Sequence, residues 1–257
     1  SGTITDSLAN LADSGSISTN FSRAKGDDGD VNVVVSDATG TLSAADLGAV
    51  TAKTGGTVTL DNAQTISGSG AELIAALKTN AATLSAASTA TVTSAVTAAV
   101  AAEIAAIASI TLDSSGSGTI TDSLANLLND GQTAISTDFS NARAEDTDVN
   151  VVINDGTGTI DAAKLSLITA KTGGTVTLQS AQTISGTGTE VTAALITDAV
   201  TPGAASNATV TGNVTAEVAG NIANVTGITA AFSGTITDSL ANLADSGSIS
   251  TNFSRAK

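Results

Sequence analysis

The chain has 257 residues, a formal net charge of −15, and no Cys, His, Met, Trp or Tyr. Only nine Lys and Arg stand against 24 Asp and Glu, which argues against nucleic-acid binding, because neutralising phosphates needs clustered basic side chains. Without His or Cys the chain lacks the commonest general bases, thiol nucleophiles and transition-metal ligands, so we expect no enzyme. No uninterrupted apolar run reaches the roughly 18 residues of a membrane span, so we expect none.

One stretch of sequence occurs three times. Residues 1–25 recur without a change at 233–257, and a related version begins at Ser117. The starting points are 116 residues apart, which divides the chain into repeat copies 1–116 and 117–232 and the start of a third copy, 233–257. The chain opens without an initiator Met, so we expect it to be a window from a longer or processed array.

Each copy contains pairs of aliphatic residues eight positions apart, in short Thr-rich segments. Apolar and polar residues alternate around them, as in Thr57–Leu60, which is typical of short strands with one buried face. Gly, Ser, Asn and Asp between the two members of a pair predict turns. We therefore expect Val34, Val58, Leu84 and Leu112 to be buried and stacked in one parallel sheet. A neighbouring row of strands should contain Leu42, Ile66, Val92 and Ile120.

An Ala-rich stretch follows the second strand of each pair. Residues 44–50 and 71–77 place Leu and Val at helical spacing, and residues 94–108 put Val96, Val100, Ile104 and Ile107 on one helical stripe. Each coil is therefore predicted to be strand, turn, strand, turn, helix. Such coils bury an apolar face only by stacking, so the predicted fold class is a repeat solenoid of the α/β kind with parallel sheets. The alternative is an all-β solenoid, in which the Ala-rich stretches are loops or strands.

One further segment of about 16 residues interrupts the regular spacing between Ile120 and Ile160. It carries residues 135–139 and an acidic loop. The sequence Ser-Leu-Ala-Asn-Leu occurs three times, each time after an Asp. These residues, Asp6, Asp122 and Asp238, are predicted to be helix N-caps rather than catalytic acids.

Two dense carboxylate clusters each precede a strand. The first contains Asp27, Asp28 and Asp30, and the second contains Glu145, Asp146 and Asp148. Closely spaced hard oxygen ligands suit Ca²⁺, so these six residues are candidate calcium ligands, and we expect no other cofactor. The alternative is a solvated acidic loop that repels wrong edge pairing. The nonapeptide of calcium-binding β-helices is absent.

The Thr-x-Thr segments predict outward-facing hydroxyl columns if the coils stack. Thr57 and Thr59 are one example. Such ladders resemble those of solenoid ice-binding proteins. The alternative is that outward Thr is simply a favourable strand residue.

Thr41–Thr59 and Thr159–Thr177 share a Thr-aliphatic start, an Ala pair, a Leu and the ending Thr-Gly-Gly-Thr-Val-Thr. This pattern resembles the long, acidic tandem-repeat proteins of bacterial surfaces, above all those of cyanobacteria, which are loosely grouped with RTX-type secreted proteins. The resemblance spans the whole chain, transfers no site residues, and implies an extracellular or cell-surface location with a role in adhesion or matrix formation. We expect a structural fibre, surface layer or matrix filament whose partners are further copies of the chain. The alternative function is the stalk or binding region of a giant calcium-dependent adhesin.

Overall fold

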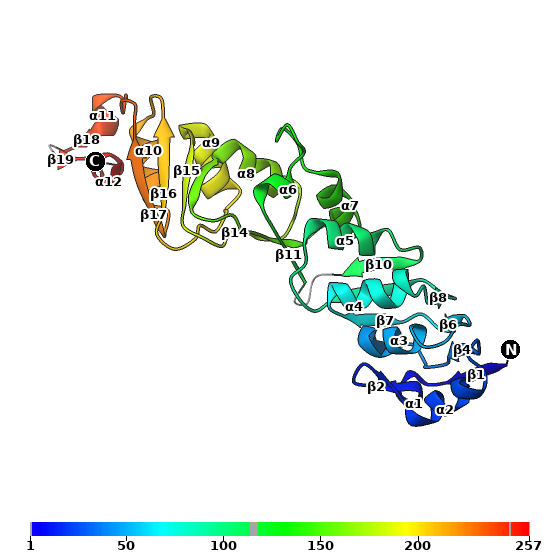
Figure 1. Cartoon of the computed structure of the whole chain (residues 1–257). Helices are drawn as coiled ribbons and strands as arrows, with labels where there is room; N and C mark the ends of the chain where they lie inside the picture. Colours follow the sequence, from blue (N-terminus) through cyan, green and yellow to red (C-terminus); the bar gives the residue numbers. More distant parts are fainter. Residues whose placement is uncertain (1, 114–117, 247, 257) are drawn as a thin grey trace. The chain divides into compact units, whose positions relative to one another are not determined.

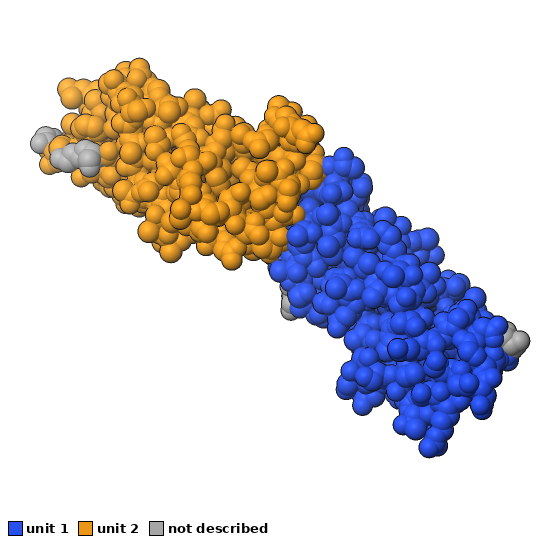
Figure 2. Space-filling view, in the orientation of Figure 1, with its two compact units in different colours: residues 1–120, 137–149 blue, residues 121–136, 150–257 orange. Residues whose placement is uncertain are grey.

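A computed structural model describes residues 2–113, 118–246 and 248–256 of the chain. These residues fold into two compact units, coloured separately in Figure 2. Unit 1 is Ser1–Ile120 with Thr137–Val149, and unit 2 is Thr121–Ser136 with Asn150–Lys257. The predicted boundary between repeat copies, at residues 116 and 117, lies outside the described residues.

Unit 1 contains two parallel sheets of short strands. The first sheet has the order β1 (Thr3–Asp6), β4 (Asn32–Val35), β6 (Val58–Leu60) and β8 (Thr83–Leu84). The second has the order β10 (Ile110–Asp113), β9 (Ser88–Val92), β7 (Thr65–Gly68) and β5 (Thr41–Ser43). Thr41 pairs with Thr65, and Thr65 with Thr89, so β5, β7 and β9 are 24-residue steps apart. Ile110 of β10 pairs with Ser88 of β9, a step of 22 residues.

One group of helices in unit 1 follows strands of the second sheet. They are α3 (Ala44–Thr51), α4 (Gly70–Ile74) with its π-helical continuation η1 (Ala75–Thr79), and α5 (Ala98–Ala105), and they lie side by side in Figure 1. Ser43, Ser69 and Thr97 cap their N-termini with side-chain oxygens. The remaining elements are α1 (Leu8–Leu11), the hairpin β2 (Ala12–Asp13) and β3 (Ser16–Ile17), α2 (Thr19–Asp27), and α7 (Thr137–Glu145), which packs on α5.

Unit 2 also alternates short parallel strands with short helices. Its sheets are formed by β11 (Thr119–Asp122, of which only the last two residues lie in this unit), β12 (Asn150–Ile153) and β14 (Val176–Leu178), and by β13 (Gly158–Asp161), β15 (Gln182–Thr187), β16 (Ser206–Thr211) and β17 (Ile228–Phe232). Its helical elements are α6 (Leu124–Leu127), α8 (Ala162–Thr169), α9 (Gly188–Thr192), η2 (Ala193–Thr197), α10 (Ala216–Ala223), α11 (Leu240–Leu243) and α12 (Thr251–Ala256). The hairpin β18 (Ala244–Asp245) and β19 (Ser248–Ile249) precedes α12.

The fold is therefore mixed α/β with several parallel sheets, and none of them closes into a barrel among the described residues. The predicted order of strand, strand and helix is observed for β4, β5 and α3 and for β6, β7 and α4. The all-β alternative is wrong, because the Ala-rich stretches form helices. Among the described residues no helix is long and apolar enough to cross a membrane.

The predicted strand rows are correct in part. The strands of Val34, Val58 and Leu84 share the first sheet, and those of Leu42, Ile66 and Val92 share the second. Leu112 was assigned to the first sheet, but it pairs with Ala90 in the second. Ile120 was assigned to the second row, but it lies in β11 and bridges Val96.

The buried phase of β4 also differs from the prediction. Val33 and Val35 are fully buried, and Val34 is only half-buried. Val33 pairs with Val58 and Val35 with Leu60, so the neighbouring strand decides which residues face inward. Three consecutive Val residues carry no alternation from which this phase can be predicted.

The start of α5 and the N-cap residues of the Leu-Ala-Asn-Leu helices also differ from the prediction. The stretch 94–108 becomes helical only from Ala98, and its buried face contains Ala98, Ala101 and Ile104 rather than the full predicted stripe. Ser residues, not the predicted Asp residues, occupy the N-cap positions before Leu-Ala-Asn-Leu; they are Ser7, Ser123 and Ser239. The preceding Asp instead accepts hydrogen bonds, as Asp122 does from the Ser123 amide at 2.9 Å and from Asn126 Nδ2 at 2.7 Å.

Candidate functional site

The first acidic loop follows α2. Asp27 is the last residue of that helix and is exposed. Asp28 Oδ2 accepts a 3.1 Å hydrogen bond from the Gly2 amide. The pKa of Asp28 is lowered mainly by a hydrogen bond with the Asp30 side chain and, to a smaller extent, by the bond from the Gly2 amide. The loop thus brings two of its three predicted ligands together and holds one of them ionised.

The Thr-Gly-Gly-Thr motif lies against the backbone of this loop. The Gly55 amide donates a 2.8 Å hydrogen bond to the Gly29 carbonyl, and the Thr54 hydroxyl donates to the Val31 carbonyl. A Cβ atom on Gly56 would lie 2.4 Å from the Val31 carbonyl oxygen. The motif therefore needs Gly at position 56 because two backbones approach each other closely there.

The second acidic loop follows α7. Glu145 is the last residue of that helix and is exposed, whereas Asp146 is only 7% exposed. The Asp148 side chain is hydrogen-bonded to Asp146. This bond, the negative charge of Asp146 and, to a smaller extent, that of Asp113 raise the pKa of Asp148. The carboxylates of this loop therefore oppose one another's ionisation.

Neither loop assembles the full predicted ligand set. The structure joins Asp28 to Asp30 and Asp146 to Asp148, and leaves Asp27 and Glu145 exposed at the ends of helices. Within the described ranges, no group of three or more His, Cys, Asp or Glu is arranged to hold a metal ion. Ca²⁺ takes six to eight oxygen ligands, so calcium binding by these six residues stays a prediction.

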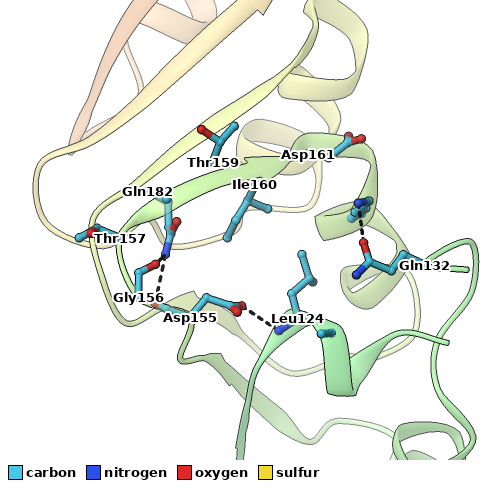
Figure 3. A pocket seen from close by; sticks show the side chains of 12 residues that line it. Leu124, Gln132, Asp155, Gly156, Thr157, Thr159, Ile160, Asp161 and Gln182 are labelled. Atoms are coloured by element: carbon cyan, nitrogen blue, oxygen red, sulfur yellow. Dashed lines mark hydrogen bonds between the residues drawn. The ribbon is translucent and has the colours of Figure 1, made fainter. Parts of the chain in front are cut away.

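A surface depression of about 360 Å³ lies in unit 2 between α6, the start of β13 and α8 (Figure 3). The Asp155 carboxylate points to the start of α6 and accepts a 2.8 Å hydrogen bond from the Leu124 amide. Lys164 Nζ donates a 2.5 Å hydrogen bond to Gln132 Oε1, and both residues line the depression. Unit 1 repeats the first of these bonds, since the Leu8 amide donates to Asp37 Oδ2 at 2.6 Å. The bonded groups that line the depression therefore join elements of the fold, which is a structural role.

Gln182 also lines this depression and is buried (Figure 3). Its side-chain Nε2 donates to the carbonyls of Gly156 and Asp155 at 2.6 and 3.1 Å. Its backbone amide donates to Ser206 Oγ at 3.0 Å. In unit 1, Gln64 makes the corresponding bonds to the 37–38 turn and to Ser88. These buried polar columns hold successive turns together. Sequence reasoning missed them, although Ala-Gln-Thr-Ile-Ser recurs at 63–67 and 181–185.

Hydroxyl columns run along the outer face of the second sheet. Parallel pairing aligns Thr41, Thr65, Thr89 and Thr111 in unit 1. In unit 2 it aligns Thr159, Thr183, Asn207 and Thr229. All eight side chains are exposed or half-buried. The residue that follows each of them in its strand faces the core.

No protein-family model, no curated protein and no solved structure matches this chain. The functional argument therefore rests on the chemistry and arrangement of its own residues.

Proposed function

We propose that this chain is a stretch of a stacked α/β solenoid and that its function is structural, in an extracellular fibre, surface layer or matrix filament. The observation that carries the proposal is the register of the parallel strands. Their pairings join residues roughly 22 to 29 positions apart, so each strand lies beside the strand one coil further along. The same steps occur in both units, for example Thr41 with Thr65 and Thr159 with Thr183.

Stacking also supplies the core. One column of inward-facing residues in unit 1 consists of Leu42, Ile66, Ala90 and Leu112, and all four are buried. The corresponding column in unit 2 consists of Ile160, Ile184, Ala208 and Ala230, and only the last is half-buried. A coil with so few apolar side chains cannot bury them alone, so each added coil stabilises its neighbours.

A structural role also agrees with the chemistry of the chain. Its buried Gln and Ser side chains bond mainly to backbone atoms of neighbouring turns, and its composition lacks His and Cys. The extracellular location rests on the resemblance to bacterial surface proteins. Further copies of the same chain are the proposed partners.

The test is electron microscopy and fibre diffraction of the purified chain. We expect filaments with a reflection at about 4.8 Å along the long axis, because the strands would run across that axis. An Ile66→Asp variant, which puts a charge into the buried column, should form none, whereas Thr147→Ser on the surface should form them normally. A discrete monomer at every concentration would contradict the fibre and favour the stalk of an adhesin.

The hydroxyl columns favour a second candidate function, recognition of an ordered surface such as ice. Thr41, Thr65 and Thr89 repeat at the spacing of parallel strands, which gives a regular array of hydroxyl groups. If this array binds ice, the purified chain should slow ice growth, and the double variant Thr65→Lys/Thr89→Lys should not. Thr147→Lys, outside the array, is the matched control. Unchanged ice growth in the presence of the unaltered chain would exclude this function.

A further inference from the structure

Three adjoining surface depressions in unit 2 share residues of β13. The first is the depression of Figure 3, and the other two have volumes of about 410 and 400 Å³. All three are lined by Thr159, whose side chain is exposed, and otherwise mainly by polar residues and glycine. Ligand pockets typically measure about 300–1,000 Å³ and are mostly apolar, so these depressions have the size of a ligand site but a polar lining.

Gln182 lines the first two depressions and carries a buried polar atom without a partner. Its Nε2 donates to two carbonyls, which fixes the orientation of the side-chain amide. Its Oε1 accepts no hydrogen bond from any residue that the structure describes. A Cβ atom on Gly158 would lie 3.8 Å from this oxygen, so a side chain at position 158 would contact it. Buried acceptors normally find a donor, and a ligand hydroxyl group beside Gly158 would supply one.

The equivalent glutamine in unit 1 has no unpaired atom. Gln64 also donates through Nε2 to the turn before the neighbouring strand, but its Oε1 accepts a 3.1 Å hydrogen bond from the Gly40 amide. The bonds of Nε2 are therefore structural and common to both units. The unpaired acceptor is a property of Gln182 in unit 2.

Two substitutions between the repeats also distinguish this place in unit 2. Gly156 stands where unit 1 has Ala38, so the lining of the first depression lacks a side chain there. Lys164 stands where unit 1 has Asp46, so a donor replaces an acceptor. Unit 2 thus offers more open space and a more balanced set of hydrogen-bonding groups.

The charges around the first depression favour an uncharged ligand. Lys164 has three N–H donors, and Gln132 accepts one of them. The carboxylates of Asp155 and Asp161 each accept a hydrogen bond from a backbone amide. One cationic and two anionic side chains disfavour an anion by their net charge, and the ammonium group disfavours a metal ion.

We propose that this surface of unit 2 binds an uncharged polysaccharide. Sugar hydroxyl groups both donate and accept, which suits the Gln182 Oε1 acceptor, the Thr hydroxyls and the Lys164 donors. Gly158 pairs with Gln182 at the start of β13 and Asp161 ends the strand, so the bonding groups extend over about 10 Å, more than one sugar ring. The site goes beyond the proposed structural function, because it requires no filament.

Binding should be weak and should depend on hydrogen bonds. The described residues that line the three depressions include no aromatic side chain on which a sugar ring could stack. Each hydrogen bond gains little net free energy over the bond to water that it replaces. We therefore expect a dissociation constant of about millimolar for a tetrasaccharide.

NMR titration of the ¹⁵N-labelled full chain with cellotetraose, and separately with maltotetraose, tests the proposal. Backbone amide signals of residues 156–161 and of Gln182 should shift as the sugar is added, whereas those of the corresponding residues 38–43 and of Gln64 should not. A sulfated tetrasaccharide should bind about fivefold or more weakly than the uncharged sugars, because the chain and the site are both net negative.

Gly156→Leu should weaken binding about tenfold or more by placing an apolar side chain in the lining. A Cβ atom there would meet no other atom within 4 Å, and Gly156 does not have a positive φ, so the fold should accept the change. Ala38→Leu, at the matching position of unit 1, should bind as the unaltered chain does. Thr159→Val removes one hydroxyl group and should weaken binding about two- to tenfold, with Thr41→Val as its matched control.

Absence of shifts with both uncharged sugars at about 50 mM would overturn the proposal. Shifts confined to unit 1, or equal affinities for the Gly156→Leu and Ala38→Leu chains, would do the same. Should Gly156→Leu lose the native spectrum, the comparison of Thr159→Val with Thr41→Val decides. Filaments without sugar binding would overturn this proposal alone, and sugar binding by a chain that never forms filaments would overturn only the structural function.

Discussion

The backbone amide of Leu124 donates a 2.8 Å hydrogen bond to Oδ2 of Asp155, 31 residues later in the chain. Leu8 and Asp37 form the same bond at 2.6 Å. The first amides of a helix have no partner within it, and a carboxylate is favourable at this end of the helix dipole. One acidic side chain therefore ties the start of α1 to the turn after β4, and another ties the start of α6 to the turn after β12.

Removing this bond should destabilise unit 2. We expect Asp155→Ala to lower the free energy of unfolding by about 1–2 kcal/mol, because a hydrogen bond to a charged group is lost. Asp155→Asn should lower the free energy of unfolding by less than Asp155→Ala does. Urea unfolding followed by circular dichroism measures the change, with exposed Asp130→Ala as the control. Equal midpoints for the Asp155→Ala and Asp130→Ala chains would show that the bond contributes nothing.

The close backbone contact at Gly56 should make this position intolerant of any side chain. We expect Gly56→Ala to cost about 1–3 kcal/mol, because its Cβ would lie 2.4 Å from the Val31 carbonyl oxygen. Gly26→Ala is the matched control, since its Cβ would meet no atom within 4 Å and Ala favours the helix there. Thermal unfolding of both variants is the measurement, and a Gly56→Ala chain as stable as the control would contradict the contact.

The two capping boxes should make stability depend on pH. Hydrogen bonds from the Ser69 amide and hydroxyl lower the pKa of Glu72, and Thr187 does the same for Glu190. A lowered folded-state pKa stabilises the fold above the ordinary value of 4.5, and this contribution is lost as the pH falls through and below that value.

Glu72→Gln/Glu190→Gln should therefore flatten the fall in melting temperature between about pH 5 and pH 3. Glu217→Gln, in a helix without a capping box, should keep the slope of the unaltered chain. If the melting temperature of the double variant falls with pH as steeply as that of the unaltered chain, other groups cause the pH dependence.

Asp148 should act in the opposite direction. Its pKa is raised by the Asp146 hydrogen bond and charge, so the stability of the fold decreases as the pH rises through the ordinary value of 3.8. In metal-free buffer we expect Asp148→Asn to raise the melting temperature at pH 7 and to change it little at pH 3. Asp130→Asn, at an exposed position, is the control. A lower melting temperature for Asp148→Asn at pH 7 would show that its charge is stabilising.

Calcium binding by the acidic loops predicts the reverse effect in the presence of the ion. A ligand that binds only the folded state raises the melting temperature, so Ca²⁺ should stabilise the unaltered chain and a chelator should remove the effect. Asp30→Asn/Asp148→Asn should lose the response to Ca²⁺, and Asp130→Asn should keep it. Identical melting curves with Ca²⁺ and with chelator would contradict calcium binding and favour the alternative, that both loops are solvated surface.

The acidic loops show how far prediction of the candidate site reached. Their positions after a helix and before a strand follow from the sequence, because the clusters and the strand patterns are local. The pairing of Asp146 with Asp148, and the nearby charge of Asp113, do not follow from it. Asp113 precedes Asp148 by 35 residues and reaches it only through the packing of α7 in unit 1.

The 116-residue repetition, the short strands in pairs, the helices after them and the Gly-rich turns follow from the sequence, because these depend on local spacing and backbone preference. The tertiary packing, in contrast, decided that Val33 rather than Val34 faces inward, and that Leu112 joins the second sheet. It also decided that the identical Leu8 and Leu240 differ from buried to exposed. Burial is a property of what lies beside a residue, and identical segments with different neighbours bury different faces.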